Sequence, residues 1–158
     1  MKIKNLGINF KTLHTVGDGS CLVHAVLQGF SKDYDNLKND MEKVKFADEV
    51  RYHFSKILEH PSPLNETKNI YQTLSRGELE EISKDVKEAK IDYMKAYLNS
   101  RRFLTLQYIE LISDIFDINI IFINDKDKDI YNSGDLELLF KKERETVFVY
   151  YIEEAHFE

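Results

Sequence analysis

The sequence predicts an α+β domain in which a layer of helices packs on a small, mostly C-terminal β-sheet. Apolar residues recur at helical spacing over much of the chain before Asp117, and β-branched runs replace that spacing afterwards. A helix that is apolar on nearly every side follows a glycine-rich turn close to residue 20. Such a helix has to be buried, so we expect it between the helical layer and the sheet. The whole chain, residues 1–158, is predicted to be a single domain because it is long enough for one core.

Helices are predicted first along the chain. The apolar helix begins at Cys21, and a longer helical pattern then runs until Pro61 and Pro63 end it. Its apolar positions are Met41, Val44, Ala47, Val50, Phe54, Ile57 and Leu58. A capping box is predicted at Ser75–Glu78, followed by one helical face from Leu79 to Leu98. Thr105 is predicted to cap a last helix carrying Ile109, Ile112 and Phe116.

Strands are predicted after Asp117. The β-branched run Ile118–Ile123 and the apolar run Val147–Ile152 are the two main strands. A polar turn is expected over Asn124–Asp129. Ile130–Tyr131 and the stretch from Leu136 to Phe140 are expected to add a short strand and a turn.

Composition narrows the classes of function. The 22 basic and 28 acidic residues give a net charge of −6, which disfavours nucleic-acid binding and suits either a basic partner or simple solubility. No apolar stretch approaches the roughly 20 residues of a membrane span, so no membrane association is expected. No signal peptide opens the chain and a single cysteine allows no internal disulfide. We therefore expect a monomer in the reducing environment of the cytoplasm.

The single cysteine, Cys21, carries the most informative chemistry. It ends the turn Gly17-Asp18-Gly19-Ser20 and opens the apolar helix. Unpaired N–H groups and partial positive charge at a helix N-terminus stabilise an anion, so we expect a lowered thiol pKa and an accessible, reactive thiolate. Gly17 and Gly19 allow the backbone to curl so that its N–H groups converge. A nucleophile beside converging donors is what acyl transfer requires.

A base for this thiol is found at the other end of the chain. His156 follows the predicted strand Val147–Ile152, and Glu158 comes two residues later. A carboxylate there is able to fix the tautomer of the imidazole and stabilise its charged form. Cys21, His156 and Glu158 are therefore predicted as nucleophile, base and orienting group.

Both ends of the chain resemble a known family. Gly17-Asp18-Gly19-Ser20-Cys21-Leu22-Val23-His24-Ala25 resembles the nucleophile motif of the ovarian tumour (OTU) cysteine deubiquitinases, and His156-Phe157-Glu158 resembles their closing motif. Glu158 departs from the commoner Asp or Asn of that motif. The resemblance implies a papain-like OTU fold with the nucleophile at the N-terminus of a central helix. It also implies oxyanion donors from the backbone N–H groups of Asp18 and Cys21.

The activity implied by the resemblance is that of a thiol-dependent isopeptidase. Its substrate is the bond between the C-terminal glycine of ubiquitin and a lysine, its partner is ubiquitin or polyubiquitin, and it needs no cofactor or metal. The helical region before Asn99 is one candidate for holding ubiquitin. Two alternatives stay open: an OTU-fold module that binds ubiquitin with little or no catalysis, and a general papain-like peptidase. The chain is rich in Lys, Asn and Ile, which is typical of an AT-rich genome. Compact OTU domains are common in viruses and intracellular bacteria, so the resemblance implies a viral or bacterial effector that acts in the host cytosol.

The remaining candidate residues are assigned structural roles. His24 lies three residues after Cys21, but in so apolar a helix a core histidine is favoured over a second base. The side chain of Asp18 is expected to bond the backbone of its own turn. His14, His53 and His60 have no partner motif and are predicted at the surface or in structural roles. The five histidines and one cysteine lack metal-ligand spacing, so no metal site is expected.

Overall fold

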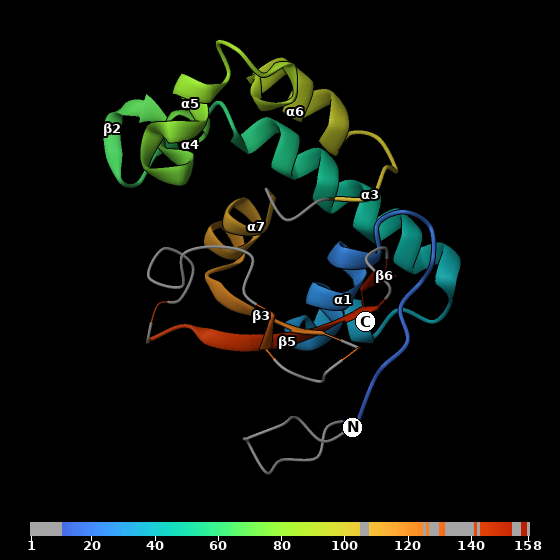
Figure 1. Cartoon of the computed structure of the whole chain (residues 1–158). Helices are drawn as coiled ribbons and strands as arrows, with labels where there is room; N and C mark the ends of the chain where they lie inside the picture. Colours follow the sequence, from blue (N-terminus) through green and yellow to red (C-terminus); the bar gives the residue numbers. More distant parts are fainter. Residues whose placement is uncertain are drawn as a thin grey trace.

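The computed structural model describes residues 11–104, 108–124, 126, 130–131, 141, 143–152 and 156–157. A mostly helical half lies above a sheet, and the first helix lies next to that sheet (Figure 1). The architecture is α+β, as the sequence predicts. The helical segments are α1 (Cys21–Phe30), α2 (Lys32–Asp35), α3 (Asp40–Ile57), α4 (Ile70–Thr73), η1 (Leu74–Gly77), α5 (Glu78–Ile82), η2 (Lys87–Ala89), α6 (Ile91–Leu98) and α7 (Ile109–Phe116). The strands are β1 (Pro61–Ser62), β2 (Asn65–Asn69), β3 (Ile118–Asn124), β4 (Ile130–Tyr131), β5 (Glu145–Ile152) and β6 (His156–Phe157).

The main sheet has the strand order β4-β3-β5-β6. Its two long strands, β3 and β5, run parallel, with Ile120 opposite Val147. The shorter β4 and β6 pair antiparallel at the two edges. Most residues of β3 are buried, which is typical of a parallel strand covered on both faces and explains its continuous apolar sequence. The two strands predicted after Asp117 are therefore confirmed, with β5 beginning two residues earlier, at Glu145.

Helix α1 is the buried helix that the sequence predicts. All side chains from Cys21 to Leu27 are buried. The helix packs against β5 and β6 on one side and against α3 on the other. Its close approach to the sheet depends on Gly29, where an added Cβ would overlap the side chain of Val147.

Helix α3 forms the next layer. Asn39 caps it by accepting a hydrogen bond of 3.0 Å from the amide of Glu42. The helix ends before Pro61, as predicted, and Ala47, Phe54 and Leu58 are buried. Met41, predicted on the same face, is instead 82% exposed because it lies in the first turn, beyond the edge of the core.

The segment between α3 and α6 differs most from the prediction. The helical face predicted from Leu79 to Leu98 is divided among α5, η2 and α6, and the β1–β2 hairpin, α4 and η1 precede it. Ser75, Arg76 and Gly77 have left-handed backbones, with φ of 51°, 57° and 90°, so no capping box forms at Ser75. The amide of Ser75 instead donates to the carboxylate of Glu110 in α7, at 2.9 Å to each oxygen. A capping box does occur six residues earlier, between Asn69 and Gln72.

The last helix, α7, carries buried Ile109 and Ile112, as predicted. Its predicted cap, Thr105, lies outside the described residues, as do the segment from Leu136 to Phe140 and most of the turn after Asn124. The described helices include none with both the length and the apolar character needed to cross a lipid bilayer.

The contact between Gly29 and Val147 gives a stability prediction. Gly29→Ala should lower the free energy of unfolding by about 1–2 kcal/mol, because overpacking against β-branched Val147 outweighs the gain of about 1 kcal/mol in helix propensity. Urea denaturation measures this loss. In the Val147→Ala background the same substitution should cost less, since the methyl groups in its way are gone. A Gly29→Ala variant at least as stable as the native chain would contradict the close packing.

Candidate active site

The loop that leads into α1 is shaped by one glycine. Gly19 has a φ of +89°, and a Cβ at this position would overlap the carbonyl oxygen of Arg101. Only glycine satisfies both constraints. Gly17 has no positive φ and open space around it, so the prediction that both glycines are needed for the curl holds for Gly19 alone.

The thiol of Cys21 lies at the N-terminus of α1, facing β6. The backbones of Phe157, of Leu22 and of Cys21 itself act on the thiol in the direction that lowers its pKa. The side chain is almost completely buried, with 1% of its surface exposed. The helix terminus thus acts on the thiol in the expected direction, but the expected accessibility of the thiol is not observed.

The pKa of the Cys21 thiol is raised, which corrects the predicted lowering. Burial is the main cause, and the negative charge of Asp18 acts in the same direction. The hydrogen bonds from Phe157, Leu22 and Cys21 itself oppose these effects but do not outweigh them. The sequence prediction counted the helix terminus and a charged imidazole of His156, whose side chain lies outside the described residues, and it omitted the cost of desolvating a thiolate.

His156 is placed near Cys21 by β6. In this strand His156 pairs with Ile152 and Phe157 pairs with Tyr151. Phe157 anchors the strand: its ring packs on those of Phe122 and Tyr151, and its carbonyl accepts a hydrogen bond of 2.7 Å from Thr15 Oγ1. The structure thus brings the backbone beside His156 to the thiol, while the side chain of His156 and all of Glu158 lie outside the described residues.

Half-buried Asp18 and buried His24 form a polar chain beside the nucleophile. Asp18 Oδ1 accepts from the amide of Ser20 at 2.8 Å, which is the turn bond that the sequence predicts. The same oxygen lies 3.2 Å from His24 Nε2, and His24 Nδ1 lies 2.7 Å from the hydroxyl of Tyr34. When Nε2–H donates to the carboxylate, Nδ1 accepts from Tyr34, so a neutral imidazole satisfies both partners. Burial lowers the pKa of His24. These contacts agree with the core histidine favoured by the sequence.

A buried arginine is the residue that sequence reasoning missed. Arg51, in α3, is 1% exposed and donates hydrogen bonds to Gly19 O and Ser20 Oγ of the loop. Its other donors reach the carbonyl groups of Tyr97, Leu98 and Arg102. The sequence does hold a signal, because Arg51 stands at helical spacing between Ala47 and Phe54, on the buried face. A charge in the middle of an apolar stripe is a candidate for a buried, fully bonded group.

The other histidines outside the loop behave as predicted. His14, His53 and His60 are exposed. Across the described ranges, no group of three or more His, Cys, Asp or Glu side chains is arranged to hold a metal ion.

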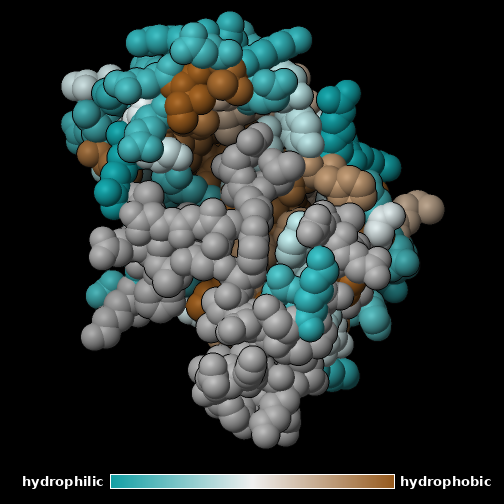
Figure 2. Space-filling view, viewed as in Figure 1, coloured by the Kyte–Doolittle hydropathy of each residue, from teal (hydrophilic) through white to brown (hydrophobic). Residues whose placement is uncertain are grey.

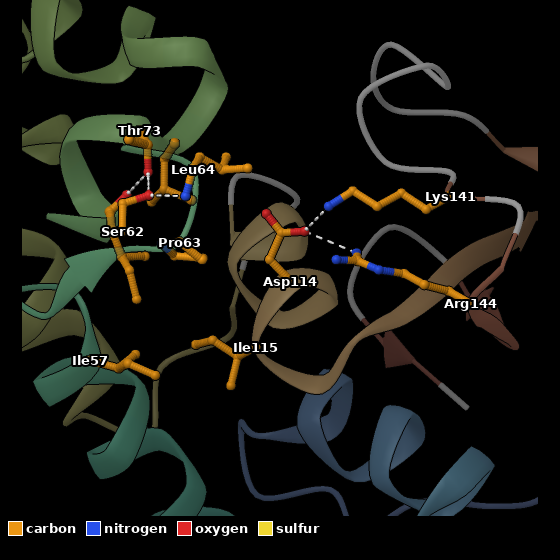
Figure 3. Close-up of a pocket in the computed structure, with 11 residues that line it drawn as sticks. Ile57, Ser62, Pro63, Leu64, Thr73, Asp114, Ile115, Lys141 and Arg144 are labelled. Carbon is orange, nitrogen blue, oxygen red and sulfur yellow. Dashed lines mark hydrogen bonds and ion pairs between the residues drawn. The ribbon is translucent and has the colours of Figure 1, made fainter. Parts of the chain in front are cut away.

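A pocket of about 300 Å³ lies apart from Cys21, between the β1–β2 hairpin and α7 (Figure 3). Its apolar wall includes Ile57, Leu64 and Ile115. At its polar end Asp114 lies 3.1 Å from Lys141 Nζ and 2.9 Å from Arg144 Nη1. Arg144 Nε also lies 2.6 Å from Asp117 Oδ1, so each cation has a carboxylate partner. None of the lining residues belongs to the loop, α1 or β6.

Comparison with solved structures identifies the fold. The chain resembles the OTU domain of OTUD1 with a TM-score of 0.54 and 12% identity, over 92% of this chain and 81% of that one. This chain has an OTU fold. A similar match, with a TM-score of 0.53 and 13% identity, covers 91% of this chain and 83% of an OTU deubiquitinase from Wolbachia pipientis wMel. No model of a known protein family matches the sequence, and no curated protein matches it. The OTU fold predicted from the two end motifs is thus confirmed by structure.

The burial of Cys21 gives a prediction for its reactivity. In the native protein at pH 7, iodoacetamide should alkylate Cys21 more slowly than it alkylates a small free thiol, and the rise of this rate with pH should come at higher pH than for the free thiol, whose pKa is about 8.5. Intact-mass spectrometry measures the labelling, and Cys21 is the only cysteine that can respond. The urea-unfolded chain is the control and should react like the free thiol. Equal rates for folded and unfolded protein at pH 7 would contradict the occluded, protonated thiol.

The raised pKa of the Cys21 thiol also makes the stability of the fold depend on pH. Because the pKa of Cys21 is raised in the folded state, folding favours the neutral thiol. This contribution to stability is fully present below the unfolded thiol pKa of about 8.5 and is lost as pH rises above it.

Proposed function

We propose that this chain is a cysteine deubiquitinase that hydrolyses the isopeptide bond between the C-terminal glycine of ubiquitin and a lysine amine. The observation that carries the proposal is the position of its only cysteine. In an OTU fold, Cys21 is the first residue of the central helix, and this helix packs against β6, the strand of His156 and Phe157.

The reaction divides into two steps. His156 accepts the proton of Cys21, and the thiolate attacks the carbonyl carbon of the terminal glycine. Backbone N–H groups of Asp18 and Cys21 hold the resulting oxyanion, and His156 returns the proton to the departing lysine amine. This leaves a thioester on Cys21. Water, deprotonated by His156, then attacks the thioester and releases ubiquitin with a free carboxylate, while Glu158 keeps the imidazole oriented.

Deprotonation must overcome the raised pKa of the thiol. The negative charge of Asp18 favours the neutral thiol of Cys21 over the thiolate. The positive charge formed on His156 therefore has to stabilise the thiolate. An imidazolium within a few ångströms does this more effectively in a buried site than in water. The low exposure of Cys21 also implies that ubiquitin has to open a path to the sulfur when it binds.

Ubiquitin is proposed to contact the helical half before Asn99. Apolar side chains are exposed there at Leu64, Ile82 and Val86. Figure 2 shows a brown patch within the mainly teal surface of this half of the molecule. A surface of exposed apolar residues rimmed by polar ones is typical of a site for a protein partner.

The buried thiol favours one alternative: an OTU-fold module that binds ubiquitin without cleaving it. A ubiquitin with a C-terminal electrophile separates the candidates. We expect it to form a thioether adduct with the native chain and none with Cys21→Ala. Binding without an adduct would favour the module, and cleavage of ordinary peptides without an adduct would favour a general peptidase. Absence of both adduct and binding would reject ubiquitin as the partner.

The base is tested separately. His156→Ala should lower kcat/KM for ubiquitin-chain cleavage by roughly 10²–10⁴-fold, because the thiol loses its general base. His53→Ala is the matched control, since His53 is exposed on α3 and should leave the rate unchanged. Cleavage is followed on gels of ubiquitin chains across pH 6–9. If His156→Ala keeps the native rate, another group acts as the base.

A further inference from the structure

Arg51 has every donor engaged in the interior. Its Nε–H bonds Leu98 O at 2.9 Å, and Nη2 bonds Tyr97 O at 3.1 Å and Arg102 O at 3.0 Å. Its Nη1 bonds Ser20 Oγ at 3.0 Å and Gly19 O at 3.4 Å. These are five bonds for the five N–H groups of a guanidinium. The acceptors are all neutral, and they lie on two segments that are far apart in the sequence.

The loop is held from two sides by this arrangement. One side is the guanidinium, which fixes Gly19 O and Ser20 Oγ from α3. The other is the segment after α6, whose Arg101 carbonyl packs directly against Gly19 and whose Arg102 carbonyl is bonded by the same guanidinium. Lysine cannot make the same set of hydrogen bonds, since an ammonium group has three donors and lacks the planar arrangement of five donors in a guanidinium.

The bond to Ser20 has a second effect. Ser20 is the N-cap residue of α1, a position where serine normally accepts a hydrogen bond from a helix amide. Here its side chain makes no capping bond and accepts from Arg51 instead. The Ser20 hydroxyl therefore does not cap the first amides of α1, which lie at the residue that carries the thiol, Cys21.

We propose that Arg51 is a positioning residue for the proposed reaction: it holds the Gly19–Ser20 backbone in place and keeps the Ser20 hydroxyl away from the amides that serve the thiolate and the oxyanion. This inference rests on the proposed deubiquitinase activity. It assigns Arg51 no contact with substrate. Its effect should therefore fall on kcat, while KM for ubiquitin chains stays nearly constant.

The test compares four variants of the full chain: two single substitutions, their combination and one control. Arg51→Lys should lower kcat roughly 10²-fold, the size of effect expected when reacting groups shift by about 1 Å. Ser20→Ala removes one acceptor of Arg51 and should lower kcat by about 3–10-fold. The double variant, Arg51→Lys with Ser20→Ala, should have a kcat no lower than that of Arg51→Lys, because both changes break the bond between Arg51 and Ser20. Ser55→Ala is the matched control: Ser55 also links α3 to the end of α6, through Asn99 Oδ1 at 3.1 Å, without touching the loop. It should leave kcat unchanged even where it lowers the melting temperature.

Hydrogen exchange of the amides of residues 19–22 provides a readout that does not depend on catalysis. It should be faster in Arg51→Lys and Ser20→Ala and unchanged in Ser55→Ala. A folded Arg51→Lys with native kcat and native exchange overturns the proposal, as does a Ser55→Ala effect of equal size on both. If Arg51→Lys does not fold, native kcat and exchange in Ser20→Ala overturn it. If the native chain neither cleaves ubiquitin nor reacts with the ubiquitin electrophile, the proposed function fails. In that case the role of Arg51 is judged by hydrogen exchange alone, and unchanged exchange in Arg51→Lys or Ser20→Ala overturns it.

Discussion

Burial of α1 is the constraint on which the other layers depend. The helix buries every side chain from Cys21 to Leu27, and it packs against the sheet and α3 together. Gly29 sets its distance from β5, because any larger residue would meet Val147. Phe116 of α7 extends the same packing, with its ring 5.0 Å from that of Phe30 and 5.2 Å from that of Phe54. A rigid, buried α1 gives its first residue, Cys21, a fixed position between two layers.

Polar and charged groups at the start of α1 lose their contact with water on burial, and hydrogen bonds with neighbouring groups compensate for most of this loss. Arg51 and His24 have partners for all their nitrogen atoms. Asp18 Oδ2 is the exception: it is buried without a hydrogen-bond partner among the described residues. The charge of Asp18 disfavours a thiolate on Cys21, whereas the backbone of Phe157 favours it. Under the proposed function, this balance keeps the thiol protonated at rest and gives His156 the task of ionising it.

The OTU fold is retained here with little identity of sequence. At 12–13% identity to the two solved domains, most side chains differ, and yet the match extends over more than 90% of this chain. Fold similarity at that level reflects the order of helices and strands and the shape of the core, since many apolar sequences satisfy the same packing. Function depends on individual groups such as Cys21 and His156, so it has to be established by experiment on this chain.

The sequence by itself determined the features that depend on local pattern. A cysteine after Gly-Ser at the head of an apolar helix specified where α1 begins and what it buries, and the β-branched run after Asp117 specified β3. Helical spacing alone does not distinguish a buried from an exposed position at the end of a helix. This is why the sequence predicts the exposed Met41 on the buried face of α3.

Tertiary structure decided what depends on groups distant in the chain. At the kink, the amide of Ser75 is bonded by a carboxylate 35 residues away in the sequence. Arg51 of α3 is bonded to the loop and to the end of α6 because two segments far apart in the sequence supply its acceptors. The pKa of Cys21 was likewise set by burial and not by its helix terminus alone. Hydrogen bonding and desolvation act through space, so only the folded arrangement fixes their sum.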